Sequence, residues 1–525
     1  MSPPPSIQLS QEELQGLLSQ LRPLLPEALF ARVESLLRVM LWILGVIEQK
    51  QITLARLRRM LFGETSEKTR KIFPPPAAPE SSGQGGKPKP KRKGHGRKGA
   101  KEYPGARRLK VPHPNLQAGN LCPQCRKGKL HLFHEPAKIL RLFAQPLFQA
   151  MLFELERLRC ALCGALFTAP APPEAGQGKY DQSVGVMLAV LRFGMGQPMY
   201  RIEKWQQHFG VPLAASTQWE LIDAASAIPK LIYEALLDLA ANGSVLYTDD
   251  TSMRVQSLRK EISEKQLART GIFTTGILSR VGPHQIAVFI TGQRHAGENI
   301  DQVLKRRLAG TAVPLHMCDG LAHNHSKEFE TILCNCLCHS RRHVVKVADS
   351  FPLECRKILE SLAEVYRIDA QAKEQGLSDE QRLLAHQTYS KAIVDDLHQW
   401  MQLQLDQKQV EPNSGLGQAL NYMLRRWEPL TRFLTVPGAP LDNNAVERVL
   451  KMAILHRRNS LSYKTVRGAQ LGDIFMSLIH TCELNQINPF DYLMALQRHA
   501  DSVPKNLTAW LPWNYQATLP SLESG

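Results

Sequence analysis

The spacing of apolar positions changes several times along the chain. Residues 27–63 place an apolar residue at every third or fourth position, which predicts one long helix. Residues 180–227 show the same spacing in two segments that meet at Phe209–Pro212. From residue 244 the spacing drops to two, which predicts three consecutive strands, at 244–255, 269–281 and 284–292. The chain therefore combines helical regions with a region that begins as a sheet.

The sheet region continues into an α/β pattern. A helical segment at 299–308 is followed by the apolar strand 312–319, which ends in a carboxylate. Residues 345–435 are helical and separate this strand from a further helix that begins near Leu441. Three strands, a helix and a fourth strand predict an α/β core, and the intervening helices predict an insertion within it.

Each helical region before the core allows two interpretations. In residues 27–63, a heptad register has apolar residues at six of eight a and d positions. This fits a short coiled coil or a core-packed helix equally. These positions are Leu37, Met40, Leu44, Ile47, Gln51, Leu54, Arg58 and Leu61. In residues 180–227, the order of helix, glycine turn and helix is a helix-turn-helix pattern, although ordinary helical hairpins share it.

The charge of the chain is strongly positive and unevenly distributed. Of 525 residues, 65 are Lys or Arg and 48 are Asp or Glu, which gives a net charge of +17. Residues 87–110 alone hold eleven basic residues and one acid, with few apolar side chains to bury. We therefore predict a disordered basic linker whose charge density favours contact with nucleic-acid phosphates over a passive spacer. The candidate contact residues are Lys87, Lys89, Lys91, Arg92, Lys93, Arg97 and Lys98.

The ten cysteines include two closely spaced pairs. The pairs are Cys122 with Cys125 and Cys160 with Cys163. Four thiolates at this spacing can surround one Zn²⁺ and leave no position for water, which predicts a structural zinc ribbon rather than two redox motifs. The sequence shows no signal peptide and no apolar stretch of membrane length, so we expect a cytoplasmic protein, where paired cysteines indicate metal before disulfide.

Two acids stand out by their places on the predicted strands. By alternation, Asp249 shares a strand face with apolar residues, whereas Asp250 shares the opposite face with polar ones. An ionised carboxylate on an apolar face is costly unless a cation or hydrogen bonds compensate it, which singles out Asp249. Asp319 ends the fourth strand, and Gly320 after it would let the backbone turn sharply. Ends of strands are where α/β sheets bind ligands.

A third acid, Glu447, lies in the first turns of a helix that Asp442 or Asn443 would cap. Its simplest interpretation is an ion pair with Lys451, one turn further along the helix. Together with the two strand acids, however, it matches what two divalent metals require, because Mg²⁺ or Mn²⁺ needs several carboxylate oxygens. Acids on the first strand, the fourth strand and a later helix form a ribonuclease-H-like arrangement.

Two other groups have weaker claims to chemistry. The tripeptide His323–His325 has the sequence His-Asn-His, which is also the name of a nuclease motif, but a match of three residues carries almost no information. Cys334, Cys336 and Cys338 with His339 could form a second metal site, although reduced cysteines behind a strand more often serve as small buried apolar groups. We interpret His339, Arg341 and Arg342 as a basic helix start near a scissile phosphate, in preference to a surface ion-pair cluster.

These features, in this order, resemble the transposases of the insertion sequence 66 family. Leu57–Gly63 with Ser66–Lys68 is similar to the phrase that ends the family's N-terminal helical segment, and the two cysteine pairs resemble its zinc finger. Pro198–Arg201 followed by Gly210-Val211 is similar to its helical region before the catalytic core.

The core motifs extend the resemblance. Thr248–Thr251 resembles the family's Asp-Glu-Thr phrase, and Asp319-Gly320 its Asp-Gly-Tyr, with Leu321 in place of the aromatic residue. Cys336–Arg342 resembles its Cys-Trp-x-His-x-Arg-Arg, with Leu337 at the tryptophan position. Asp442–Arg448 is close to its Asn-Asn-x-x-Glu-Arg. The last two motifs are the most specific.

The resemblance implies a DDE transposase in which Asp249, Asp319 and Glu447 are the catalytic acids that hold Mg²⁺ or Mn²⁺. Hydrolysis would free a 3′-hydroxyl at each element end, and that hydroxyl would attack target DNA without a covalent enzyme intermediate. The expected partners are element ends and target DNA, a second copy or more on paired ends, and small accessory proteins of the same element, in a bacterial, nucleoid-associated setting without a membrane. The expected DNA contacts in the core are His339, Arg341, Arg342 and Arg448.

The expected fold is multidomain α/β plus α, with a ribonuclease-H-like core that carries a helical insertion. Its segments are a helical or coiled-coil segment (1–73), a basic linker (74–110), a zinc ribbon (111–172), a helix-turn-helix-like region (173–240), the first part of the core (241–344), the insertion (345–436), the second part of the core (437–500) and a tail (501–525). The rival from another class is a catalytically decayed transposase that acts as a zinc-ribbon DNA-binding regulator. It would share the charge and the zinc but would not need three acids, and an RNA-directed nuclease is a weaker third reading.

Overall fold

The computed structural model describes residues 16, 18–27, 29–35, 37, 72, 114–121, 123–131, 147–159, 166–176 and 178–523. Contacts between Cα atoms divide the chain into two compact units, residues 76–151 and the remainder. The basic linker and most positions of the N-terminal heptad register lie outside the described residues. No helix in the described ranges is long and apolar enough to cross a membrane.

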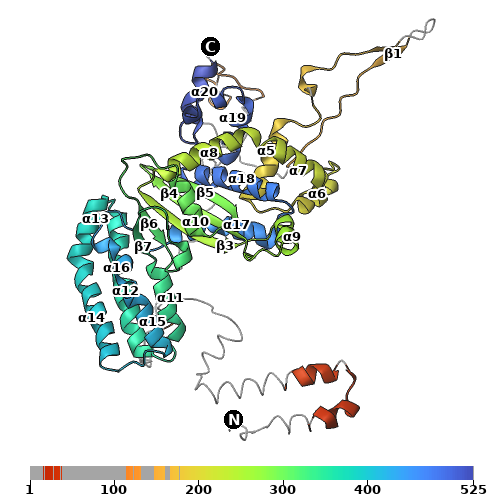
Figure 1. Ribbon diagram of the computed structural model, residues 1–525. Helices are drawn as coiled ribbons and strands as arrows, with labels where there is room; N and C mark the ends of the chain where they lie inside the picture. The colour runs from red at the N-terminus through yellow and green to blue at the C-terminus, as the bar shows by residue number, and fades with distance from the viewer. Residues whose placement is uncertain are drawn as a thin grey trace. The chain divides into compact units, whose positions relative to one another are not determined.

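A five-stranded mixed sheet forms the core of the larger unit (Figure 1). Its strands are β3 (Val245–Ser252), β4 (Phe273–Val281), β5 (His284–Gly292), β6 (Leu315–Cys318) and β7 (Ile332–Asn335). In space the order is β5-β4-β3-β6-β7: the first three strands form an antiparallel meander, and β6 and β7 continue it in parallel with β3. The mixed α/β fold with many helices is thus confirmed, whereas β7 has only four residues and was not predicted.

The central strand, β3, is regular along its whole length. All eight of its residues pair in unbroken register with β4, from Val245 opposite Arg280 to Ser252 opposite Phe273. Because no residue is inserted, consecutive side chains alternate between the two faces of the sheet. Asp249 and Asp250 therefore point to opposite faces.

Helices cover both faces of the sheet. Helix α17 (Asn444–Ser460) packs on β3 and β4, where a Cβ at Gly276 would lie only 2.8 Å from Leu450 Cγ. Helices α8 (Ala227–Ala241) and α10 (Ala296–Leu304) pack on β4 as well, and the short helix α9 (Gln256–Glu264) follows β3. The close approach at Gly276 brings α17 down onto the strand that adjoins β3.

Helix α18 (Val466–Leu484) closes the β5 edge of the sheet with side chains instead of another strand. Four polar residues, spaced four apart, accept hydrogen bonds from alternate backbone N–H groups of β5. The pairs are Asn485 with Gln285 N (3.3 Å), Thr481 with Ala287 N (3.1 Å), Ser477 with Phe289 N (2.9 Å) and Asp473 with Thr291 N (2.8 Å). Four helical residues rise about 6 Å and two strand residues about 6.6 Å, so the two repeats match. The edge is thereby protected from pairing with other strands.

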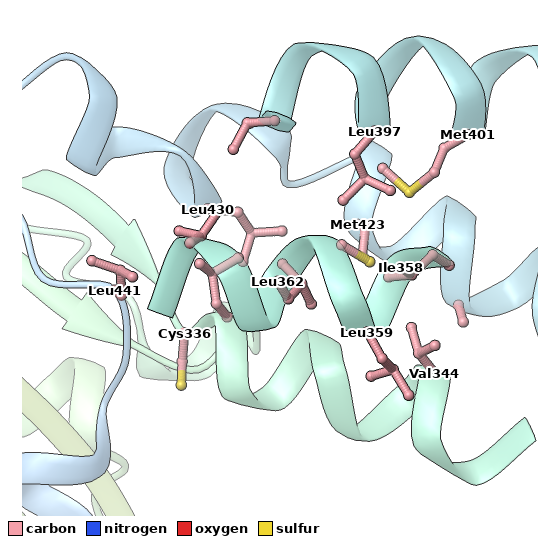
Figure 2. Close-up of a cluster of buried hydrophobic side chains, with 14 of the residues drawn as sticks. Cys336, Val344, Ile358, Leu359, Leu362, Leu397, Met401, Met423, Leu430 and Leu441 are labelled. Atoms are coloured by element: carbon pink, nitrogen blue, oxygen red, sulfur yellow. The ribbon is translucent and has the colours of Figure 1, made fainter. Parts of the chain in front are cut away.

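The helical insertion packs at the other edge of the sheet, next to β7 (Figure 1). It comprises α11 (Leu337–Val347), α12 (Pro352–Glu374), α13 (Asp379–Ala385), the π-helical turn η6 (His386–Ser390), α14 (Lys391–Asp406), α15 (Gly415–Leu424), α16 (Trp427–Leu430) and η7 (Arg432–Leu434). Figure 2 shows part of its apolar core, where residues such as Leu362 and Met423 meet between the helices. This core extends to β6 and β7 through Met317 and Cys334, so the insertion and the sheet share it.

A second group of helices lies before β3 in the sequence. Helices α5 (Gln182–Ala189), α6 (Met199–His208) and α7 (Ala215–Ala224) follow one another, with the π-helical turn η4 (Val190–Gly194) after α5. The turn between α6 and α7 contains Gly210 at φ +69°, a left-handed conformation that favours glycine. After α18 come α19 (Pro489–Arg498), η8 (Val503–Lys505), η9 (Leu507–Trp510) and α20 (Tyr515–Glu523).

Two small antiparallel elements precede these helices. In the smaller unit, an isolated bridge joins Leu121 to Lys129. In the larger unit, β1 (Arg157–Arg159) pairs with β2 (Leu166–Thr168). Each element therefore spans one of the two cysteine pairs of the sequence. Other short elements are η1 (Arg22–Leu24), η3 (Pro173–Ala175) and η5 (Ala322–Asn324).

Candidate active site

Asp249 lies in the middle of β3, and its carboxylate has little to compensate its charge. Its Oδ1 accepts a hydrogen bond from the backbone N–H of Asp250 at 2.8 Å, and no ion pair involves it among the residues that the structure describes. Burial raises the pKa of Asp249 to about 7, against the lowering effect of that hydrogen bond. The carboxylates of Asp319 and Glu447 raise the pKa further. The three predicted acids thus lie close enough to act on one another electrostatically.

Asp250, on the opposite face, has a structural role. Its Oδ1 accepts from Thr275 Oγ1 at 2.5 Å, and its Oδ2 accepts from Ala296 N at 2.9 Å and faces His295 Nδ1 at 3.3 Å. Because Ala296 begins α10, the carboxylate holds the N-terminus of that helix against the sheet. This face is polar, as expected, but it is also buried: Thr248 is fully covered and contacts His316 Nε2 at 2.8 Å.

Asp319 follows β6 directly, as the sequence predicted. Its Oδ1 accepts hydrogen bonds from Asn324 Nδ2 at 2.7 Å and from Leu321 N at 3.1 Å, which fix the side chain at the end of the strand. Asn324 is the middle residue of the histidine tripeptide, so in this structure that tripeptide helps to hold Asp319.

Gly320 serves a different purpose from the one expected. Its φ is not in the left-handed region, so the backbone conformation there does not itself require glycine. Instead, a Cβ there would lie 2.5 Å from Tyr422 OH and 2.5 Å from Arg426 Nε, closer than any side chain tolerates. The glycine makes room for two residues of the helical insertion.

Tyr422 and Arg426 are neighbours of the site that the sequence analysis missed. Arg426 Nε donates to Gly320 O at 3.0 Å, and its guanidinium lies 4.2 Å from the centre of the Tyr422 ring. His343 stacks on the same ring at 4.4 Å. These residues lie about a hundred positions from Asp319 in the sequence, and no local pattern marks them. The insertion therefore places an aromatic and cationic surface beside the second acid.

Glu447 lies in the first turn of α17, and its ion pair differs from the one expected. Its Oε2 accepts from Arg342 Nη2 at 3.3 Å, and its Oε1 lies 3.9 Å from His339 Nε2. The anticipated pair with Lys451 does not form. Its Oε1 is buried and accepts no hydrogen bond from the described residues. Within the described part of the chain, one oxygen of the third acid thus has no donor.

Asn443 links α17 to β3 next to Asp249. The fully buried side chain donates from Nδ2 to Thr248 O at 2.9 Å, and its backbone N–H donates to Cys336 Sγ at 3.2 Å. Asn443 occupies the N-cap position, but its side chain does not cap the helix; Asp442 Oδ1 instead accepts from Asn444 N at 3.0 Å. The two motifs that were most specific in the sequence are thus bonded to each other and to the first acid strand.

The remaining predicted residues divide into described and undescribed positions. Arg341 is half-buried on α11, and Arg448 is exposed beside Glu447 on α17. Of the four cysteines assigned to zinc, Cys125 is described and exposed, whereas Cys122, Cys160 and Cys163 lie outside the described residues. The seven candidate contacts of the basic linker, Lys87, Lys89, Lys91, Arg92, Lys93, Arg97 and Lys98, also lie outside them.

Comparison with known proteins identifies the family. The family model "Transposase IS66 family" matches residues 177–471, which is more than half of the chain. The protein belongs to the IS66 transposase family. The match extends from the helices before β3 through the helical insertion to α18, so the three acids all lie within it.

Several proteins of Sinorhizobium fredii (strain NBRC 101917 / NGR234) are similar to this IS66 family transposase. Protein y4hP is 27% identical over 69% of this chain and 67% of its own length. Protein y4jD is 26% identical over 75% of this chain and 78% of its own length. Both are described only as uncharacterized proteins.

The donor set of the three acids fits the divalent metal that the family implies. All of the available donors are carboxylate oxygens, which suit Mg²⁺ or Mn²⁺. Asp249 has a carboxylate whose charged form is disfavoured by burial and by its acidic neighbours, and one oxygen of Glu447 has no donor from the residues that the structure describes. A cation bound among them would relieve both deficits.

Proposed function

We propose that this protein is a DDE transposase that cleaves the DNA ends of an insertion element and joins their 3′-hydroxyls to target DNA. The observation that carries the proposal is the convergence of Asp249, Asp319 and Glu447, which come from β3, the end of β6 and the start of α17. Henceforth we call these three residues the acid group. Membership of the IS66 transposase family supports the same reaction class.

We further propose that the core is ribonuclease-H-like. Support comes from the sheet order β5-β4-β3-β6-β7 and from acids on the first strand, after the fourth strand and on a later helix. The sequence analysis expected the acids on these elements, but it did not predict the strand order. The helical insertion lies between the second and third acids, as it does in the proposed domain order.

In the proposed mechanism, divalent metal bound by the acid group would activate the attacking oxygen and stabilise the leaving oxygen at phosphorus. The residues around the acid group have distinct tasks. Arg342 and His339 line the Glu447 side and would contact the scissile phosphate. Arg426 and Tyr422 would hold the strand that passes Asp319, the cation by charge and the ring by stacking. Water is the nucleophile in cleavage, and the freed 3′-hydroxyl takes its place in strand joining.

DNA binding is assigned mainly to the regions before the core. We propose that Cys122, Cys125, Cys160 and Cys163 hold one structural Zn²⁺ in a ribbon. The spacing of the two pairs supports this, because four thiolates can close one tetrahedral zinc site. The basic linker would add sequence-independent phosphate contacts.

The test is an assay of strand cleavage and joining on a duplex that carries the inverted repeats flanking the gene, with Mg²⁺ or Mn²⁺. Asp249→Ala, Asp319→Ala and Glu447→Ala should each lose about 10²-fold or more in rate, the scale seen when one preorganised electrostatic group is removed. A mobility-shift measurement should show that all three variants still bind the duplex.

Asp250→Asn is the matched control, because it changes the adjacent acid and keeps an oxygen to accept from Ala296 N. It should retain activity. Activity in Asp249→Ala with loss in Asp250→Asn would mean that the assignment of the strand face is wrong, while the reaction class would stand. If all three acid-group variants join DNA as well as the wild type, the alternative of a non-catalytic DNA-binding regulator becomes the better account.

A further inference from the structure

A second kind of metal-ligand cluster overlaps the acid group. Potential ligand atoms of Cys336, His339 and Glu447 all lie within 4.8 Å of one another. Cys336 precedes α11, His339 lies in its first turn, and Glu447 faces both from α17. Thus the cluster combines a thiol, an imidazole and a carboxylate, and it shares only the carboxylate with the acid group.

The geometry of this cluster is close to that of a zinc site. Bonds of about 2.0–2.3 Å at tetrahedral angles place ligand atoms about 3.3–3.8 Å apart. His339 Nε2 and Glu447 Oε1 are already 3.9 Å apart, so a shift of about 1 Å in the widest pair would suffice. Three protein ligands would leave a fourth position for water or another ligand, unlike the closed four-ligand structural sites.

Cys336 belongs to the apolar core, and its sulfur also lies within 4.8 Å of ligand atoms of His339 and Glu447. Figure 2 shows Cys336 beside Leu441 at the margin of the buried cluster, with its sulfur pointing away from Leu362 and Ile358. Its Sγ accepts a hydrogen bond from Asn443 N at 3.2 Å. The hydrogen bond to Cys338 and burial raise the pKa of Cys336, so the thiol is neutral without metal and must lose its proton when metal binds.

A positive charge already occupies the neighbourhood of the cluster. Arg342 contacts His339 Nε2 through Nη1 at 3.2 Å and Glu447 Oε2 through Nη2 at 3.3 Å. Because a guanidinium can only donate, His339 Nε2 presents its lone pair toward this cation. Glu447 Oε1, by contrast, is buried without a donor among the described residues. An incoming cation would bind Glu447 Oε1 and would take the place of the Arg342 guanidinium at His339 Nε2.

We propose that Cys336, His339 and Glu447 form a binding site for a thiophilic divalent cation of the Zn²⁺ class, distinct from the hard-metal site of the acid group. A thiolate and an imidazole select Zn²⁺ over Mg²⁺. Occupancy takes Glu447 away from the acid group, so this cation opposes DNA cleavage. That consequence rests on the proposed transposase function, whereas the binding site itself does not.

The first experiment measures binding with Co²⁺ as a spectroscopic probe, on the full-length protein with its own zinc retained. Wild type should show a thiolate-to-cobalt charge-transfer band that Cys336→Ala lacks, and zinc released during the titration would reveal exchange at the ribbon. Cys338→Ala is the matched control, because it changes the neighbouring thiol outside the cluster, and it should keep the band. His339→Ala should weaken cobalt binding at least tenfold.

Thermal unfolding of each variant shows whether it is folded. If Cys336→Ala does not fold, His339→Ala and Glu447→Gln test the metal site instead, because they alter partly exposed side chains. A cobalt band that is the same in wild type, His339→Ala and Glu447→Gln overturns the site. So does a band that disappears in Cys338→Ala but persists in Cys336→Ala.

The second experiment adds Zn²⁺ to the cleavage assay at fixed Mg²⁺, with each variant compared with its own zinc-free rate. Wild type and Cys338→Ala should be inhibited at least tenfold at a Zn²⁺ concentration that leaves His339→Ala less than twofold inhibited. Equal inhibition of all three overturns the proposed antagonism. Cobalt binding as expected, without DNA cleavage under any condition, supports the site and contradicts the transposase proposal instead.

Discussion

The acid group and the helical insertion each bury a carboxylate, but the two carboxylates differ in the partners that surround them. At the acid group, Asp249 receives one backbone hydrogen bond and faces two further acids. In the insertion, Asp369 on α12 faces Lys373 Nζ at 2.6 Å, Arg382 Nη2 at 2.8 Å and His386 Nε2 at 3.3 Å. We call Asp369 and these three partners the Asp369 cluster.

The difference appears in the two pKa values. Burial raises the pKa of Asp249 to about 7, and its acidic neighbours add to the rise. Burial would also raise the pKa of Asp369, but its hydrogen bonds from His386, Lys373 and Arg382 outweigh burial and hold the pKa well below its usual range. A buried acid that serves the fold is surrounded by donors, whereas a buried acid that is left short of them is prepared for a cation from outside.

The largest effect is expected on stability at the Asp369 cluster. Asp369→Ala leaves Arg382 and His386 without their acid in a buried setting, so it should lower the free energy of unfolding by about 3–5 kcal/mol. Urea unfolding at pH 7 measures this loss. Asp249→Ala, which removes a carboxylate that the fold does not compensate, should cost less. An equal or larger loss for Asp249→Ala would contradict the comparison.

The same variant has a predictable pH dependence. Because folding lowers the pKa of Asp369 from its ordinary value of 3.8, its stabilisation is complete above about pH 4 and is lost as the pH falls toward the folded-state pKa. The stability difference between wild type and Asp369→Ala should therefore shrink in acid. A constant difference between pH 7 and pH 2 would show that lost packing, and not lost charge, accounts for it.

The second largest effect concerns metal. Mg²⁺ at about 100 times its dissociation constant should raise the free energy of unfolding of the wild type by about 2.7 kcal/mol, because the cation binds the folded acid group only. Asp249→Asn should lose most of this gain, while Asp369→Asn should keep it despite its lower starting stability. Thermal unfolding with and without Mg²⁺ measures both. A similar Mg²⁺ gain in the two variants would place the cation elsewhere.

The local parts of this structure could be predicted from the sequence. The alternation of β3, β4 and β5 predicted their places, with β5 found at 284–292 as expected, and Asp319 at a strand end followed from its apolar strand. Asp249 was separated from Asp250 by alternation alone, which is reliable here because β3 has no bulge.

What the sequence could not show depends on contacts between distant segments. Tyr422 and Arg426 reach Gly320 across about a hundred residues, and Arg342 rather than Lys451 pairs with Glu447. The contact of α18 with β5 did leave a signal, since the polar residues that bond to β5 recur every four positions along α18 and at its C-cap, Asn485. That signal has a physical meaning only once β5 is known to be an edge.

A smaller effect on stability should show that a raised pKa does not by itself identify a metal ligand. Asp473 on α18 is also buried, and burial raises its pKa to about 7 against the hydrogen bonds from Thr291 N (2.8 Å) and Thr291 Oγ1 (2.6 Å). Because the folded-state pKa is raised, the cost of ionising Asp473 is absent below about pH 4, grows as the pH rises and is complete above about pH 7. Asp473→Asn should therefore be more stable than wild type at pH 8, by roughly 1 kcal/mol or more since one pKa unit is about 1.4 kcal/mol.

The control for Asp473→Asn is its response to metal and acid. At pH 4 its advantage should vanish, and at pH 8 it should keep the full Mg²⁺ gain of the wild type, because both carboxylate oxygens already have donors from Thr291. Loss of the Mg²⁺ gain in this variant would mean that a raised pKa alone marks the metal site. The presence or absence of hydrogen-bond donors around a buried acid would then not distinguish metal ligands from structural acids.

The smallest effect is expected at an exposed ion pair of the same insertion. Lys357 on α12 and Asp396 on α14 lie 3.0 Å apart, nearly as close as Arg382 and Asp369, but their side chains are 39% and 68% exposed. Water solvates both charges in the unpaired state, so a double-mutant cycle with Lys357→Ala and Asp396→Ala should give a coupling of about 0.2–1 kcal/mol that falls with added salt. Lys357 also lies 5.6 Å from the centre of the Trp400 ring, and the cycle removes this separate contribution because it is present whether or not Asp396 is.

The corresponding cycle for Arg382 and Asp369 should give a coupling energy several times larger, and this coupling should respond less to salt. Equal couplings would mean that distance and not burial decides the strength of these pairs, and the Asp369 cluster would then no longer explain why a buried acid outside the acid group stays ionised.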